Sequence, residues 1–207
     1  WRRDSAHFTP ALVASLRGLR APPEASARAA AKGITPLGGW GSASAVSRPL
    51  DWYEARVKSI LMPSLDGRAP RAAIVTERGT VMLELLGGDA PLTVDNFMAL
   101  ARSGFYNHGA FHRVVPNFVA QDGDPRGDGN GGPPYAIRDE LNRWRYVRGA
   151  VGMALSGPDT GGSQYFLTLS PQPHLDGGYT VFARVVGGVD VMDAIVQGDR
   201  IVTIRIL

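Results

Sequence analysis

Several residue types that support common enzymatic centres are absent or scarce in this sequence. There is no cysteine, which excludes disulfides and thiolate metal sites. Only four histidines occur, none in a His-Glu-x-x-His pattern, which argues against a zinc enzyme. No apolar run approaches the roughly 20 residues that a membrane-spanning helix needs. We therefore predict no metal, no cofactor and no transmembrane segment.

The positive charge is concentrated at the start of the chain. Residues 1–70 carry ten Lys and Arg against five Asp and Glu, whereas residues 71–207 carry twelve against fourteen. The simplest interpretation is a solvated basic surface, and contact with membrane lipid, nucleic acid or an acidic protein is the alternative. No lysine follows Lys58, which argues against a lysine-rich nucleic-acid patch on the main domain, and we expect no nucleic-acid partner.

The first residue is Trp1 rather than methionine, so we expect a processed or trimmed product. Any targeting segment would then already have been removed. The sequence does not decide the localisation, and the bacterial cytoplasm and the cell envelope or periplasm both stay open.

Residues 1–70 lack the alternation of a strand and are predicted to be a basic, mainly helical extension and linker. Pro10 to Arg20 has a leucine stripe at helical spacing, and residues 24–32 are rich in alanine. Gly38 to Ser47 is rich in glycine and serine and indicates a loop, after which Asp51 is a candidate cap for another short helix. An upstream helical repeat domain that ends here is one interpretation of this zone.

Residues 71–207 are predicted to form a separate, mainly β domain. The run from Ala72 to Leu86 reads as a hairpin, Val94 to Ser103 and Val189 to Gln197 as short helices, and Ile201 to Leu207 as a closing strand. The predicted core positions are Ile74, Val81, Leu83 and Leu85 in the hairpin and Val94, Phe97, Met98 and Ala101 in the first helix. Many short strands with only two helices indicate an antiparallel barrel.

The segment from Phe111 to Asp124 places an arginine, a phenylalanine and a glutamine in a valine-rich run. Arg113 and Gln121 are eight residues apart and would share a face of one uninterrupted strand. Pro116 and Asn117 are expected to break the run into two strands. Phe118 is an odd number of residues from both, so a turn must re-aim it if all three side chains line one groove.

Three motifs, FHRVVPNF-A-Q-GD, MA–GPDTGGSQYF and LDGGYTVFARVVGG, resemble those of the cyclophilins, and the resemblance extends from about Ala72 to Leu207. The sequence is more similar to bacterial and divergent members of this family than to its other members. The resemblance implies eight antiparallel strands closed into a barrel with two capping helices, and peptidyl-prolyl cis–trans isomerase activity that assists protein folding. The implied partners are polypeptides with exposed X-Pro bonds.

Such a reaction needs few chemical groups. Rotation about an X-Pro amide crosses a barrier of about 20 kcal/mol, because resonance between nitrogen and carbonyl must be broken. A catalyst needs an apolar slot for the proline ring and preorganised donors for the twisted amide. Arginine suits the second role, since it is always charged and rich in N–H donors.

The resemblance also assigns the site. Arg113 matches the main catalytic residue, and Gln121 matches the glutamine that binds substrate backbone and supports this arginine. The matching substrate-binding positions are Phe118, Val119, Ala154, Leu155, Gln164, Phe166 and Leu175. Leu155 stands in place of a common asparagine. His174 and Tyr179 stand where many eukaryotic members have a tryptophan and a histidine, from which we expect reduced cyclosporin affinity and altered peptide preference.

Other interpretations of these residues stay open. Arg113 could pair with a surface carboxylate, the phenylalanines could be core aromatics, and His112 is assigned a structural role. The chain could instead be a proline-peptide binding module or scaffold in a larger assembly, or a chaperone that acts through residues 1–70. The Asp122–Gly131 run resembles a calcium loop but lacks its closing glutamate.

Overall fold

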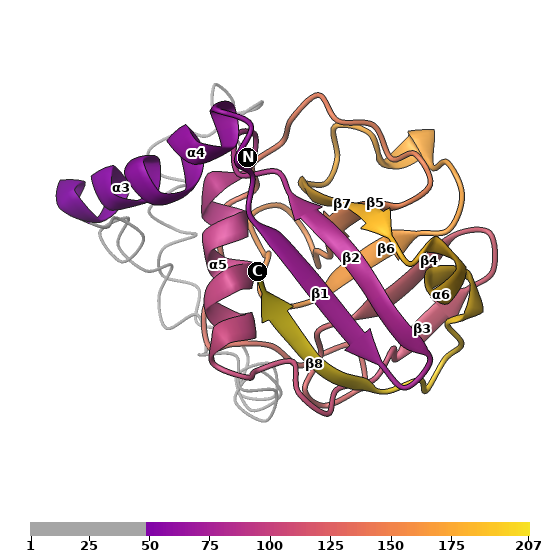
Figure 1. The fold of residues 1–207 in the computed structure, drawn as a ribbon. Helices are drawn as coiled ribbons and strands as arrows, with labels where there is room; N and C mark the ends of the chain where they lie inside the picture. The colour runs from indigo at the N-terminus through magenta and orange to yellow at the C-terminus, as the bar shows by residue number, and fades with distance from the viewer. Residues whose placement is uncertain (1–48) are drawn as a thin grey trace, which may run out of the picture. The chain divides into compact units, whose positions relative to one another are not determined.

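The structure, a computed structural model, describes residues 49–207 (Figure 1). The predicted helices and loop between residues 10 and 47 lie outside this range. The elements in chain order are α3 (Leu50–Arg56), η3 (Val57–Leu61), α4 (Met62–Leu65), β1 (Arg71–Thr76), β2 (Gly79–Leu85), α5 (Pro91–Arg102), β3 (Arg113–Val115), β4 (Val119–Asp122), β5 (Ala150–Met153), β6 (Tyr165–Thr168), η4 (Pro173–Leu175), β7 (Val181–Gly187), α6 (Val189–Ala194) and β8 (Ile201–Ile206).

The eight strands form one antiparallel sheet in the order β3-β4-β6-β5-β7-β2-β1-β8. The segment just before β3 also bonds to the start of β8. The His108 N–H donates to the Ile201 carbonyl at 2.9 Å, and the Phe111 N–H donates to the Asp199 carbonyl at 3.0 Å. These bonds bring the two ends of the sheet together, which removes most of the exposed strand edge. The predicted eight-stranded antiparallel barrel is confirmed.

The predicted elements of this domain are present. The β1–β2 hairpin pairs Ile74 with Val81 and buries all four predicted core residues. Helix α5 begins with Pro91, buries its predicted stripe, and is followed by Gly104 in the left-handed region at φ 76°. Helix α6 ends at Ala194, earlier than expected. The two helices lie on opposite sides of the strands in Figure 1.

The end of the predicted extension, residues 49–70, packs against α5. Ile60 is 2% exposed, and Arg56 pairs with Asp95 of α5 at 3.0 Å. A Cβ on Gly87 would lie 2.7 Å from the Ile60 side chain, so this glycine permits the close approach. Asp51 is not the helix cap that the sequence suggested, because α3 already begins at Leu50 and Pro49 precedes it.

Residues 49–207 form one compact unit, and the division at residues 70 and 71 stays a prediction. Among the helices of this described part, none has the length and apolar character to cross a membrane.

Candidate active site

The β3–β4 hairpin brings Arg113 and Gln121 together. The two residues are direct partners across the strand pair. Between the strands, the Phe118 N–H donates to the Val115 carbonyl at 3.0 Å, and Asn117 has φ 57°. Proline followed by a residue with positive φ is the pattern of a type II turn. The turn contains Phe118, so strand alternation does not govern its direction, and this resolves the odd spacing noted in the sequence.

A groove of about 230 Å³ lies beside this hairpin. Nine of the eleven predicted site residues line it, namely Arg113, Phe118, Val119, Gln121, Ala154, Leu155, Phe166, Leu175 and Tyr179. The other two contact residues of this set: Gln164 is hydrogen-bonded to Gln121, and the His174 ring stacks on Phe118 at 5.7 Å between centroids. Segments far apart in sequence therefore converge on one groove.

The groove has an apolar floor that is separate from the barrel core. Val119, Phe166 and Leu175 are buried and pack in a second cluster with Leu86, Tyr146, Ala150 and Val181. Alternate residues of β4 and β6 divide between the clusters, since Ala120 and Leu167 belong to the main core. The two faces of these strands thus serve different purposes.

Gly152 and Tyr146 are parts of the floor that the sequence reasoning missed. The Tyr146 ring stacks on Phe166 at 5.4 Å. A Cβ on Gly152 would lie 2.5 Å from the Phe166 ring and 2.3 Å from the Tyr146 hydroxyl oxygen. An isolated glycine in an apolar strand often marks such a close approach, and this signal could have identified Gly152.

Arg113 is exposed at the groove edge. Its Nη1 donates to Gln121 Oε1 at 3.4 Å, and its guanidinium carbon lies 5.4 Å from the Phe118 ring centroid. Among the ion pairs between residues 49 and 207, none includes Arg113. The alternative of a surface ion pair for Arg113 therefore finds no partner in this part of the chain.

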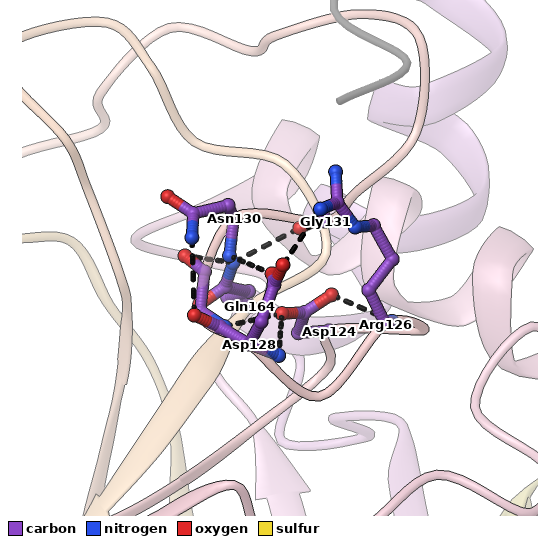
Figure 2. A network of polar contacts seen from close by, with 7 residues as sticks. Asp124, Arg126, Asp128, Asn130, Gly131 and Gln164 are labelled. Atoms are coloured by element: carbon purple, nitrogen blue, oxygen red, sulfur yellow. Dashed lines mark hydrogen bonds and ion pairs between the residues drawn. The ribbon is translucent and has the colours of Figure 1, made fainter. Parts of the chain in front are cut away.

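The two glutamines continue the polar side of the groove. Gln121 Nε2 donates to Gln164 Oε1 at 3.0 Å, and Gln164 Nε2 donates to the carbonyls of Gly129 and Gly131 at 3.0 and 2.9 Å. Gly129 and Gly131 belong to a glycine-rich loop, residues 124–131, and Figure 2 shows Gln164 beside this loop and Asp124. No pattern in the sequence connects this loop with the site.

The polar residues next to Arg113 and Gln121 in sequence differ from them in environment. Asp122 is 1% exposed, and burial raises its pKa to about 7. His112 is half-buried, and burial lowers the pKa of its imidazole. Within residues 49–207 no cluster of histidine and acidic side chains is suited to holding a metal ion.

Comparison with known proteins agrees with this geometry. Residues 71–206 match the family described as cyclophilin type peptidyl-prolyl cis-trans isomerase/CLD. A peptidyl-prolyl cis-trans isomerase of Helicobacter pylori is 44% identical over 157 residues, which cover 74% of this chain and 93% of that protein. Peptidyl-prolyl cis-trans isomerase B of Bacillus subtilis is 43% identical over 135 residues, covering 64% and 94%.

A solved structure is similar as well. The crystal structure of a cyclophilin type isomerase from Cryptosporidium parvum has a TM-score of 0.63 and 31% identity, and the match covers 67% of this chain and 98% of that one. The same protein was also solved in the presence of the dipeptide Ala-Pro.

The barrel and its groove define a cyclophilin-type domain. The chain belongs to the cyclophilin family, and it is a peptidyl-prolyl cis–trans isomerase.

Proposed function

We propose that this groove is where the chain isomerises X-Pro bonds, with Arg113 as the catalytic residue. The observation that carries the proposal is the position of Arg113, a cation at the edge of an apolar pocket, held by a neutral acceptor on Gln121. The substrates are polypeptides that expose proline. The Ala-Pro dipeptide in the Cryptosporidium parvum structure is consistent with this substrate class.

The chemistry follows from the groups present. The proline ring enters the apolar notch formed by Phe118, Phe166 and Leu175, which removes it from water. When the amide twists, its nitrogen loses resonance and becomes a hydrogen-bond acceptor. The Arg113 guanidinium donates to the twisted amide more strongly than to the planar one, so it lowers the barrier without covalent chemistry. Gln121 holds the guanidinium and binds the substrate backbone.

Replacement of Arg113 tests this role. We expect Arg113→Ala to lower kcat/KM by a factor of roughly 100 or more, the usual cost of removing a principal transition-state donor. A proline-isomerisation assay coupled to proteolysis measures the effect. Arg113→Lys keeps the charge but not the planar fork of donors. Its kcat/KM should lie between those of the parent protein and Arg113→Ala. Full turnover by Arg113→Ala would remove Arg113 from the catalytic role.

We propose also that cyclosporin binds this chain with lower affinity than it binds many eukaryotic members, because His174 stands at the groove edge where those members have a tryptophan. His174 is exposed and stacks on Phe118, but its ring offers less apolar area than an indole. Titration of cyclosporin should show about tenfold tighter binding to His174→Trp than to the parent protein. Equal affinity of the two proteins would assign drug sensitivity to other residues.

A further inference from the structure

We propose that Asp124 is a positioning residue for Arg113, acting through the loop of residues 124–131 and through Gln164 and Gln121. This inference rests on the proposed function of Arg113. Asp124 itself is 2% exposed and does not line the groove. Its effect on the reaction would be indirect, through a series of hydrogen bonds whose directions are fixed. Figure 2 shows the part of this series around Asp124 and Gln164.

The Asp124 carboxylate organises the loop around itself. It accepts backbone N–H groups of Arg126 at 2.8 Å, Asp128 at 2.9 Å and Gly129 at 2.5 Å. Burial raises the pKa of Asp124, but its backbone donors outweigh burial and hold the pKa below its ordinary value. The carboxylate is therefore ionised at neutral pH.

The loop sequence fits this arrangement closely. A Cβ on Gly131 would lie 1.9 Å from Asp124 Oδ1, so only glycine permits this approach. Gly127 and Gly129 have φ values of 69° and 81°, in the region that glycine adopts without cost. The glycines thus allow the backbone to wrap around one buried carboxylate, and the wrapped loop presents its carbonyls to Gln164.

The direction of each amide follows from the loop carbonyls. The carbonyls of Gly129 and Gly131 can only accept hydrogen bonds, so Gln164 must present its NH₂ group to them. Its Oε1 is then left to face Gln121, which must donate from Nε2. The remaining atom of the Gln121 amide, Oε1, faces the Arg113 guanidinium.

This order of donors matters for Arg113. If the Gln121 amide turned over, its NH₂ group would face the guanidinium, and two donors would oppose each other. Gln121 Oε1 would no longer orient the guanidinium toward the groove. The loop therefore determines which atom of the Gln121 amide faces Arg113. The hydrogen bonds of the Asp124 carboxylate go to the backbone of its own loop and not to Gln121 or Arg113.

Asp124→Asn is the sharpest test, because the amide has nearly the shape of the carboxylate but one of its two positions cannot accept a hydrogen bond. We expect about tenfold lower kcat/KM, while the affinity for an Ala-Pro peptide changes less than threefold, since the apolar pocket stays intact. The side-chain amide ¹H–¹⁵N resonances of Gln121 and Gln164 should shift. Asp128→Asn is the matched control: it lies in the same loop but is exposed, and it should leave both resonances and turnover near the parent values.

Gln164→Glu provides a second variant in case Asp124→Asn does not fold. A carboxylate there still accepts from Gln121 but cannot donate to the loop carbonyls. We expect a similar loss of turnover and a shift of the Gln121 resonance. The inference is overturned if Asp124→Asn keeps full turnover, or if both variants lose turnover while the Gln121 resonance stays in place. Failure of the proposed function looks different, because Arg113→Ala would then keep full turnover.

Discussion

Among the paired arginines of residues 49–207, Arg113 differs from the others in the charge of its partner. Arg56, Arg184 and Arg148 each meet a carboxylate, whereas Arg113 meets the neutral amide of Gln121. A carboxylate would neutralise much of the guanidinium charge and occupy its donors, but an amide oxygen orients it and leaves most donors to the substrate. We infer that a neutral partner suits Arg113, because its N–H donors must stay available to stabilise the twisted amide in the transition state.

Asp122 should make stability depend on pH. Its folded-state pKa of about 7 lies above the ordinary value of 3.8, so the folded protein favours the protonated form. Its contribution is fully present below about pH 4 and is lost as pH rises through 7, by up to about 4 kcal/mol. Urea unfolding at pH 5 and pH 8 measures the difference. Asp122→Asn should show a smaller decline of stability between these pH values than the parent.

The comparison between the two proteins is necessary because other carboxylates act in the opposite direction. The pKa of Asp199 is held low by its hydrogen bond to Arg78, and its contribution is lost as pH falls. Since Asp122→Asn leaves such groups unchanged, the difference isolates Asp122. An identical decline in parent and variant would show that Asp122 is ionised in the folded protein at both pH values.

At the scale of elements, three neighbouring strands build the groove by register. Gln121 of β4 is paired with Phe166 of β6, and Phe166 is paired with Gly152 of β5. These pairs place the polar side chain of Gln121, the aromatic ring of Phe166 and the side-chain-free Gly152 next to one another. The missing side chain at Gly152 is what lets the Phe166 and Tyr146 rings lie against the sheet.

Gly152→Ala should therefore damage both the fold and the groove. The added methyl would overlap the Phe166 and Tyr146 side chains, and such overpacking costs about 1–3 kcal/mol. We expect lower stability in urea and weaker binding of an Ala-Pro peptide, as Phe166 is displaced. Gly187→Ala is a matched control in β7, where the new Cβ would make an ordinary 3.4 Å contact with Met82. Equal effects of the two changes would contradict the assigned role of Gly152.

The elements show where sequence reasoning succeeded. The β1–β2 hairpin and α5 follow from their apolar spacing, because each buries one face in the main core. The break at Pro116 and Asn117 was also predictable from turn chemistry. The direction of Phe118 was not, since it depends on the turn geometry at Asn117 rather than on alternation.

At the scale of the whole molecule, the main core of the barrel and the groove lie apart. The main core lies on one face of the strands, and the smaller cluster beneath the groove lies on the other. Motif resemblance identified the groove residues, but contacts that join distant segments were not predictable. The bonds between residues 108–111 and 199–201, and the link from Asp124 to Gln164, depend on three-dimensional closure.

The most direct test of the account is two-dimensional exchange NMR of an Ala-Pro peptide saturated with the whole protein. This measurement follows cis–trans interconversion on the protein itself and records binding separately. We predict exchange between bound cis and trans peptide in the parent, and binding without detectable exchange in Arg113→Ala. Exchange at the parent rate in Arg113→Ala, or binding without exchange in the parent, would contradict the claim that the Arg113 guanidinium lowers the barrier.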